Sequence, residues 1–104
     1  MRAVVVVSTA PSAVAARRIA RVLVGSRAAA CVTVVPKAAS VYRWKGKIKN
    51  ADEALLLIKT TAKNFVKVEK AIRLNHPYSV PEIIGLPIVR GSKEHLSWLD
   101  TCVR

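Results

Sequence analysis

The sequence predicts an α+β fold in which strands and helices follow the order strand–helix–strand–strand–helix–strand, with a further helix at the end. Two observations lead to this prediction. Residues 28–61 contain two long extended segments, rich in β-branched and aromatic residues, that fold back on each other near Lys45-Gly46. Apolar residues recur at helical spacing in two other stretches, residues 13–26 and 62–75.

The first strand and the first helix follow from residues 3–26. Residues 3–7 are β-branched and apolar on both faces, which is typical of a strand in the centre of a covered sheet. Ser12 is the expected helix cap and Pro11 fixes the entry to a helix over residues 13–26. Three cations should face solvent: Arg17, Arg18 and Arg21. Four apolar residues should face the sheet: Ala15, Ile19, Val22 and Leu23.

The two long arms form the central feature of the prediction. Each arm should be about 13–16 residues, against a usual strand of about 5–6. Pro36 predicts a bulge or an edge position, and residues 50–52 predict a local kink. A small domain cannot cover such a ribbon, and a long unpaired edge invites aggregation, so we expect a second subunit to pair with it.

The rest of the chain completes the order of elements. The second helix should bury Phe65, Val68 and Ile72 and end before Pro77. Residues 80–88 read as an edge strand bracketed by prolines. Gly91-Ser92 opens a short helix, with Ser92 as its cap and Leu96 and Leu99 facing inward. The order is ferredoxin-like, β-α-β-β-α-β with a long hairpin between the second and third strands and a C-terminal helix, in one domain over residues 1–104.

Composition bounds the partners and the compartment. The chain has 18 Lys and Arg against 6 Asp and Glu, a formal net charge of +12. This excess favours non-specific binding of polyanions, although no nucleic-acid motif or aromatic stacking platform accompanies it. Cys31 and Cys102 form no disulfide framework, and no apolar run approaches the roughly 20 residues of a membrane span. We therefore expect a cytoplasmic protein that does not enter membranes.

Several phrases in the sequence resemble those of one protein family. They are T-A-P-S (9–12), A-A-C-V (29–32), V-P (35–36), V-Y-R-W-K-G-K-I (41–48), E-A-L-L-L-I-K-T (53–60), H-P-Y-S-V-P-E-I-I (76–84) and L-S-W-L (96–99). Together they resemble the CutA family, the divalent-cation tolerance proteins. The resemblance implies a homotrimer with paired hairpins, a role in tolerance to copper and other divalent metals, and no established catalytic reaction. Ser8 and Asn75 stand where some relatives carry Cys and His.

The resemblance also implies a set of site residues around clefts between subunits. The candidate metal ligands are His76, Cys31 and Glu82, because imidazole and thiolate suit copper or zinc. The candidate ligand-pocket or interface residues are Trp44, Glu53, Lys59 and Tyr78. Structural roles remain open for each: Cys31 as a buried core residue, His76 as a ring that closes a helix, and Trp44 as interface packing. Glu53, Lys59 and Glu82 could also form an intersubunit ion pair.

Two functions remain open at this stage. The first is a non-catalytic homotrimer that binds Cu²⁺ or another divalent cation and needs no organic cofactor. The second is a signalling trimer, similar in architecture to nitrogen-regulatory PII proteins, that holds a small anionic metabolite with Lys59 in an intersubunit cleft. The sequence shows no Ser/His/Asp set and no glycine-rich phosphate loop, so an enzyme is not predicted.

Overall fold

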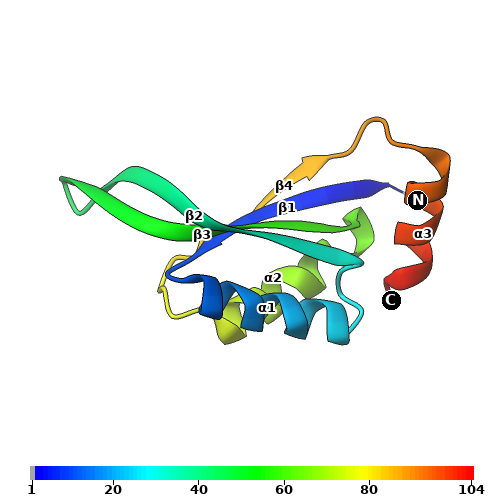
Figure 1. Cartoon of the computed structure of the whole chain (residues 1–104), viewed down its shortest axis with the longest axis horizontal. Coiled ribbons are helices and arrows are strands. Elements are labelled where there is room, and N and C mark those ends of the chain that lie inside the picture. The colour runs from blue at the N-terminus through cyan, green and yellow to red at the C-terminus, as the bar shows by residue number, and fades with distance from the viewer. Residues whose placement is uncertain (1) are drawn as a thin grey trace.

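The computed structural model describes residues 2–104 as a four-stranded antiparallel sheet with two helices on one face and a third at its end (Figure 1). The sheet order is β2-β3-β1-β4. The elements are β1 (Ala3–Ala10), α1 (Ala13–Gly25), β2 (Cys31–Trp44), β3 (Lys47–Thr61), α2 (Phe65–Asn75), β4 (Ile84–Pro87) and α3 (Lys93–Cys102), with a one-turn 3-10 helix at Ala62–Asn64. This confirms the predicted ferredoxin-like order.

Helix α1 begins as the sequence predicts. The Ser12 side chain accepts a hydrogen bond from the backbone N–H of Ala15 at 3.1 Å, which satisfies one free donor of the first turn. The helix buries Ala16, Ile19 and Leu23 against the sheet. The placement of Val22 on that face is wrong: it is 37% exposed. At about 100° per residue, Val22 lies roughly a quarter-turn from the centre of the buried stripe.

The hairpin between β2 and β3 has arms of 14 and 15 residues. Its turn places Lys45 at φ 49° and Gly46 at φ 79°, and two such left-handed residues are typical of a tight I′ hairpin turn. The pairing register shifts between Val35 and Ala38, on either side of Pro36, as predicted. The expected kink at residues 50–52 is wrong, because β3 pairs with β2 without interruption from Lys47 to Glu53. There the ladder hydrogen bonds keep the strand regular despite side chains that disfavour strands.

Two strand lengths differ from the prediction. Strand β1 continues to Ala10 rather than ending at residue 7, because it pairs with β3 along its whole length, through Ala10 opposite Ala54. Strand β4 covers four residues, Ile84–Pro87, rather than residues 80–88. Only these four residues pair with β1, and prolines at 81 and 87 lack the N–H that a longer ladder needs. The edge position predicted for β4 is confirmed.

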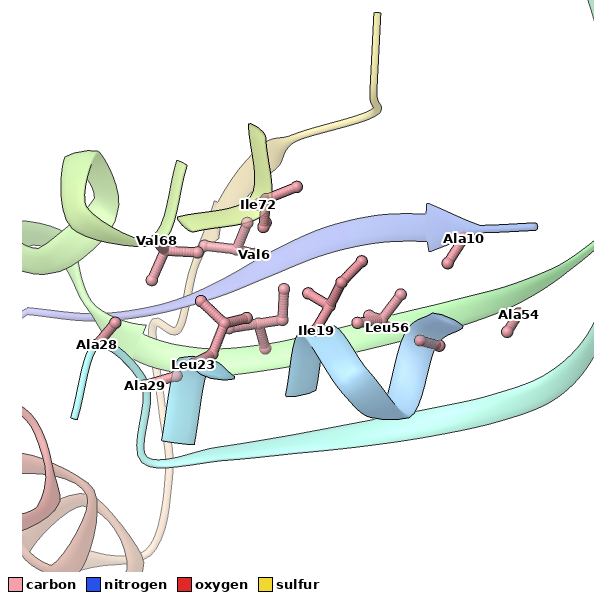
Figure 2. Close-up of a cluster of buried hydrophobic side chains, with 12 residues drawn as sticks. Val6, Ala10, Ile19, Leu23, Ala28, Ala29, Ala54, Leu56, Val68 and Ile72 are labelled. Carbon is pink, nitrogen blue, oxygen red and sulfur yellow. The ribbon is translucent and has the colours of Figure 1, made fainter. Parts of the chain in front are cut away.

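The core lies between the sheet and the two helices on one face (Figure 2). Val6 of β1 and Leu56 and Ile58 of β3 meet Val68 and Ile72 of α2, and all five are fully buried. Phe65 packs at the border of this cluster. The predicted stripe of α2 is therefore confirmed.

A second, smaller cluster holds α3 against the sheet. Ala3 and Ala30 pack with Leu99 of α3. Leu96 packs beside them, as predicted. Trp98 is 45% exposed, so it does not belong to the core of the chain.

The face of the sheet opposite α1 and α2 carries apolar side chains that these helices do not cover (Figure 1). Alternation along the strands and the pairing register place six residues together there, which we call the open sheet face: Val5, Val7, Leu55, Leu57, Ile84 and Leu86. Ile84 and Leu86 are about half exposed, at 52% and 50%. The sequence predicted that both faces of β1 are covered. Within a single chain, helices α1 and α2 cover only one of them.

Ser8 interrupts the apolar face of β1 that points at the helices. It is 1% exposed, and its hydroxyl is the single buried side-chain N or O atom without a hydrogen-bond partner in the part of the chain that the structure describes. Thr60, equally buried, donates its hydroxyl to the carbonyl of Ala28 at 2.6 Å. An unpaired buried polar group costs stability, whereas a paired one contributes to it.

The two hydroxyls predict opposite effects of removal. Ser8→Ala should raise the free energy of unfolding by up to about 1 kcal/mol, because it removes an unpaired buried hydroxyl. Thr60→Val should lower it by about 1–2 kcal/mol, because it deletes a buried hydrogen bond with little change of shape. Urea denaturation followed by circular dichroism measures both. A loss of stability in Ser8→Ala as large as that in Thr60→Val would show that Ser8 has a partner.

Candidate functional site

A pocket with a volume of about 660 Å³ lies between the hairpin and the loop that joins α2 to β4. Four of the seven predicted site residues line it: Trp44, Glu53, Tyr78 and Glu82. The remaining lining residues are Thr9, Ala39, Ser40, Val41, Tyr42, Ser79 and Val80. The structure therefore brings the predicted ligand-pocket residues together, apart from Lys59, and adds Glu82 from the predicted metal set.

Strand geometry positions the walls of this pocket. Tyr42 and Trp44 are two residues apart on β2, so both side chains lie on the same face of the ribbon. Glu53 pairs with Ala38 of β2 and lies on that face too. Glu53 is 7% exposed, and the Tyr78 hydroxyl donates a hydrogen bond to its Oε2 at 3.0 Å. The loop after α2 thus closes over the base of the ribbon through one side-chain contact.

Tyr78 is held in its neutral form by this environment. Burial raises the pKa of Tyr78 to about 12, with the hydrogen bond to Glu53 and the negative charge of Glu53 as the next causes. A phenol in this state donates a hydrogen bond and keeps its proton throughout the neutral pH range. Tyr78 therefore acts as a fixed hydrogen-bond donor that orients the Glu53 carboxylate.

His76 follows the last residue of α2 and uses both nitrogens of its ring within the chain. Its Nδ1 accepts a hydrogen bond from the backbone N–H of Tyr78 at 3.1 Å, and its Nε2 faces the carbonyl of Thr9. A neutral ring protonated on Nε2, assigned from these partners, satisfies both contacts. These contacts tie the loop after α2 to the end of β1, and neither partner belongs to α2. A metal ion would have to displace one of these partners.

Cys31 and Lys59 lie far from the pocket. They pair directly with each other at the opposite end of the hairpin, and Lys59 Nζ donates to Thr33 Oγ1 at 3.5 Å. Cys31 is 13 residues before Trp44 on β2, which at about 3.3 Å per residue is roughly 40 Å. Cys31 is half-buried rather than fully buried.

The predicted metal ligands do not meet within one chain. Among the residues described, no three His, Cys, Asp or Glu side chains lie close enough to hold a metal ion. His76, Cys31 and Glu82 therefore form no preassembled site in a single subunit. Their separation along the sheet is the reason, because Cys31 belongs to the opposite end of the hairpin. The ion pair considered for Lys59 is likewise not formed within the chain, since residues 2–104 contain only the Arg73–Glu69 pair at 3.2 Å.

The charge of the pocket is opposite to that of the chain. Two of the chain's six acidic residues line it, while none of the 18 Lys and Arg residues does. Lys47 and Lys49 pair with Trp44 and Tyr42 on the same ribbon face, but they are exposed and outside the lining. Glu53 is the only charged residue among the buried residues that the structure describes.

The sequence analysis missed part of the lining. Thr9 comes from the end of β1 and Ser79 from the loop, and nothing in their local pattern indicates a site. Tyr42 could have been found, because it lies two residues before Trp44 in a predicted strand. Six cations are exposed on α1 and near the hairpin turn, and they are the candidates for the polyanion binding that the net charge predicts: Arg17, Arg18, Arg21, Lys45, Lys47 and Lys49. Their role in binding stays a prediction.

Comparison with known proteins decides the family. The model of the family described as CutA1 divalent ion tolerance protein matches residues 4–102. The chain belongs to the CutA1 family. The resemblance read from the sequence motifs is therefore confirmed, and with it the link to divalent-cation tolerance proteins.

Relatives of this CutA1 chain come from several branches of life. The divalent-cation tolerance protein CutA of Thermus thermophilus is 50% identical over 95 residues, which cover 91% of this chain and 92% of that protein. The crystal structure of CutA1 from Oryza sativa is similar with a TM-score of 0.97 and 38% identity, over 100% of this chain and 95% of that one. A structure described as the periplasmic divalent cation tolerance protein CutA from Archaeoglobus fulgidus has a TM-score of 0.95 and 37% identity, and the match covers 98% of this chain and 99% of that one.

The compartment remains a prediction. None of the described helices combines the length and apolar character that a membrane crossing requires. The expectation of a cytoplasmic protein rests on cysteine usage and on the lack of a long apolar run in the sequence.

The environment of Tyr78 predicts its titration. In a Tyr42→Phe background, which removes the smallest of the causes of the raised pKa, the single remaining tyrosine should still have a pKa well above the 10 of a free phenol. Glu53→Gln should lower this pKa, because it removes the negative charge and leaves burial as the main cause. Because the folded-state pKa is raised, the stability tied to it is complete below pH 10 and is lost as the pH rises towards 12. Tyrosinate absorbance measures both values; ionisation near pH 10 in the background variant would contradict the contact.

Proposed function

We propose that this protein acts in divalent-cation tolerance as a non-catalytic homotrimer that binds a divalent metal ion at the Glu53 pocket. The observation that carries the proposal is a buried carboxylate with no positive partner. Glu53 is 7% exposed, and its hydrogen bond within the chain comes from the neutral Tyr78. Membership of a family named for divalent ion tolerance agrees with a cation as ligand.

The energetics of burial support a bound cation. Glu53 Oε1 has no hydrogen-bond partner among the described residues and is not fully enclosed, so it faces the pocket and is free to contact a ligand. A cation beside a carboxylate in such a partly shielded position is attracted more strongly than in bulk water. Tyr78 supplies one hydrogen bond, and no Lys or Arg lines the pocket. A cation from outside the chain would supply the missing charge.

The donor types of the pocket suit a metal ion bound through oxygen. Glu53 and Glu82 offer carboxylates, and Ser40 and Ser79 offer hydroxyls. Such donors suit hard divalent ions and Cu(II), with water completing the coordination. Glu82 is the one predicted metal ligand in this lining. In this proposal Cys31 and His76 do not bind the ion within the same chain.

The open sheet face supports assembly of several copies. Six apolar residues lie together on the side of the sheet that α1 and α2 leave uncovered, and contiguous apolar surface of this kind marks an interface. β2 also presents an outer edge of 14 residues without a partner in the chain. An edge of this length pairs readily with another chain. Glu53 shares the side of Leu55 and Leu57, so a neighbour packed there would adjoin the pocket.

The alternative of a small anionic ligand finds no support in the pocket lining. An anion needs cations or free N–H donors, and the lining contains two carboxylates without Lys or Arg. Lys59, the cation expected for this role, lies at the far end of the hairpin. Catalysis likewise lacks a basis here, because no His or Cys lines the pocket beside its serines.

Metal binding is tested by calorimetric titration of chelator-treated protein with Cu(II). We expect about one ion per chain, and Glu53→Gln and Glu82→Gln should each weaken binding by about tenfold or more through loss of a charged ligand. Glu94→Gln, an exposed carboxylate on α3, is the matched control and should leave binding unchanged.

Two further variants decide which set of residues holds the ion. Cys31→Ser and His76→Gln should retain binding, because neither residue lines the pocket. If these two variants lose the ion and Glu53→Gln retains it, the site is the one expected from the sequence and the pocket proposal is wrong. Flat titrations of the unaltered protein with Cu(II) and with a hard ion such as Mn(II) would contradict metal binding altogether.

Assembly is tested by replacing an apolar residue of the open sheet face. Leu57→Glu should convert the trimer to smaller species, because burying a carboxylate in a largely apolar interface costs solvation that the one neighbouring cation, Lys59, replaces only in part. Val14→Glu is the control, since Val14 is 75% exposed on α1, on the other side of the sheet. Sedimentation velocity measures the mass, and circular dichroism checks that both variants fold. A monomeric unaltered protein, or an unchanged trimer in folded Leu57→Glu, would contradict this interface.

A further inference from the structure

We propose that the Glu53 pocket also takes an organic ammonium ion, such as an alkylamine or a short polyamine, with its cationic nitrogen beside Glu53. This inference shares with the proposed function only the need of Glu53 for a positive charge. It concerns a different class of ligand, because the walls of the pocket are aromatic as well as acidic.

The aromatic content of the pocket is the first argument. The chain has five aromatic residues of the Phe, Trp and Tyr type, and three of them line this one pocket: Tyr42, Trp44 and Tyr78. Aromatic rings attract cations through their electron-rich faces, and ammonium groups are the ligands that groups of such rings recognise. Metal ions gain little from aromatic carbon, so metal binding leaves these three residues unexplained.

The size of the pocket is the second argument. Its volume of about 660 Å³ equals that of roughly 20 waters at about 30 Å³ each. A divalent ion with its ligand atoms at about 2.0–2.6 Å would use the carboxylates and a few waters, and it would leave most of this volume and the aromatic walls without contact. An alkylammonium ion fills such a space with its carbon chain and needs only one or two close oxygen atoms.

The third argument is the arrangement of hydrogen-bond acceptors. Tyr78 bonds Oε2 of Glu53 and thereby fixes the direction of the carboxylate, which leaves Oε1 to accept a further hydrogen bond. A primary ammonium group carries three N–H donors and no acceptor. Ser40 and Ser79 add hydroxyl oxygens to the lining, and Glu82 adds a second charge. A diamine could therefore place one nitrogen at each carboxylate.

The test titrates n-butylammonium into chelator-treated protein and follows tryptophan fluorescence and heat. We expect saturable binding by n-butylammonium and weaker or absent binding by n-pentanol, an uncharged alcohol with a chain one carbon longer. Glu53→Gln should abolish binding. Trp44→Leu should weaken it by about two- to fivefold, the effect of losing a partly exposed cation–aromatic contact.

Matched variants separate the two classes of ligand. Trp98→Leu is the control for Trp44→Leu, since Trp98 is similarly exposed, at 45% against 42%, but lies on α3 outside the pocket. Trp44→Leu should leave Cu(II) affinity unchanged, whereas Glu53→Gln removes both ligands. Failure of metal binding with retained ammonium binding would thus overturn the proposed function alone. Failure of ammonium binding with retained metal binding would overturn this inference alone.

Two other outcomes would overturn the inference. Equal binding of n-pentanol would show a plain apolar pocket. The second outcome is that n-butylammonium binds only to a variant in which Lys45, Lys47 and Lys49 are replaced by Ala. That result would show that a lysine of a second copy already fills the pocket. All three lysines are exposed near the hairpin turn, and each carries the same ammonium chemistry. In that case the pocket serves assembly and not a free amine.

Discussion

The structure depends on the unequal lengths of two paired strands. β3 has 15 residues and its core partner β1 has eight, so β1 reaches only from Ala3 opposite Thr61 to Ala10 opposite Ala54. The other half of β3 has β2 as its only partner and extends beyond the core as a two-stranded ribbon (Figure 1). Isolated ribbons of this kind are marginally stable in water. The projecting half is therefore the part of the chain that most needs a second subunit.

The pocket lies at the step that this difference creates. Glu53 is the first residue of β3 beyond the end of β1, and Thr9, near the last residue of β1, lines the same pocket. Where a strand ends, its neighbour loses one covering partner, and the loop from Tyr78 onwards fills part of the space. The step thus explains how a carboxylate comes to be buried without a lysine or arginine beside it. The basic residues occupy the helices and the ribbon surface instead.

Local signals in the sequence predicted most of the fold. Ser12 caps α1, Pro36 lies in the register shift, and Lys45-Gly46 forms the turn, because each depends on a few neighbouring residues. Val22 was misplaced because the exact centre of a helical stripe depends on the sheet it meets. The regular pairing at residues 50–52 was missed because propensity is overridden by the ladder on the partner strand.

The candidate site was predictable in part. Family motifs named four residues that do meet, but the contact between Tyr78 and Glu53 joins positions 25 apart and follows from no local pattern. The same motifs grouped Cys31 with His76, although the hairpin carries Cys31 away from the pocket. Residues on a long ribbon can be near in a motif list and distant in space. Tertiary geometry, and not residue type, decides which of them share a ligand.

The length of a ribbon that lies outside the core can change, but only by an even number of residues in each arm if its side chains are to keep their faces. Its residues pack against no helix, so both arms could be lengthened or shortened near the turn without disturbing Val6, Leu56 or Ile58. Removing one residue from each arm, however, turns every more distal side chain to the opposite face. Trp44 would then leave the pocket side while the core stayed intact. Evolution can therefore change the reach of this hairpin only in steps of two residues per arm if the aromatic wall is to be kept.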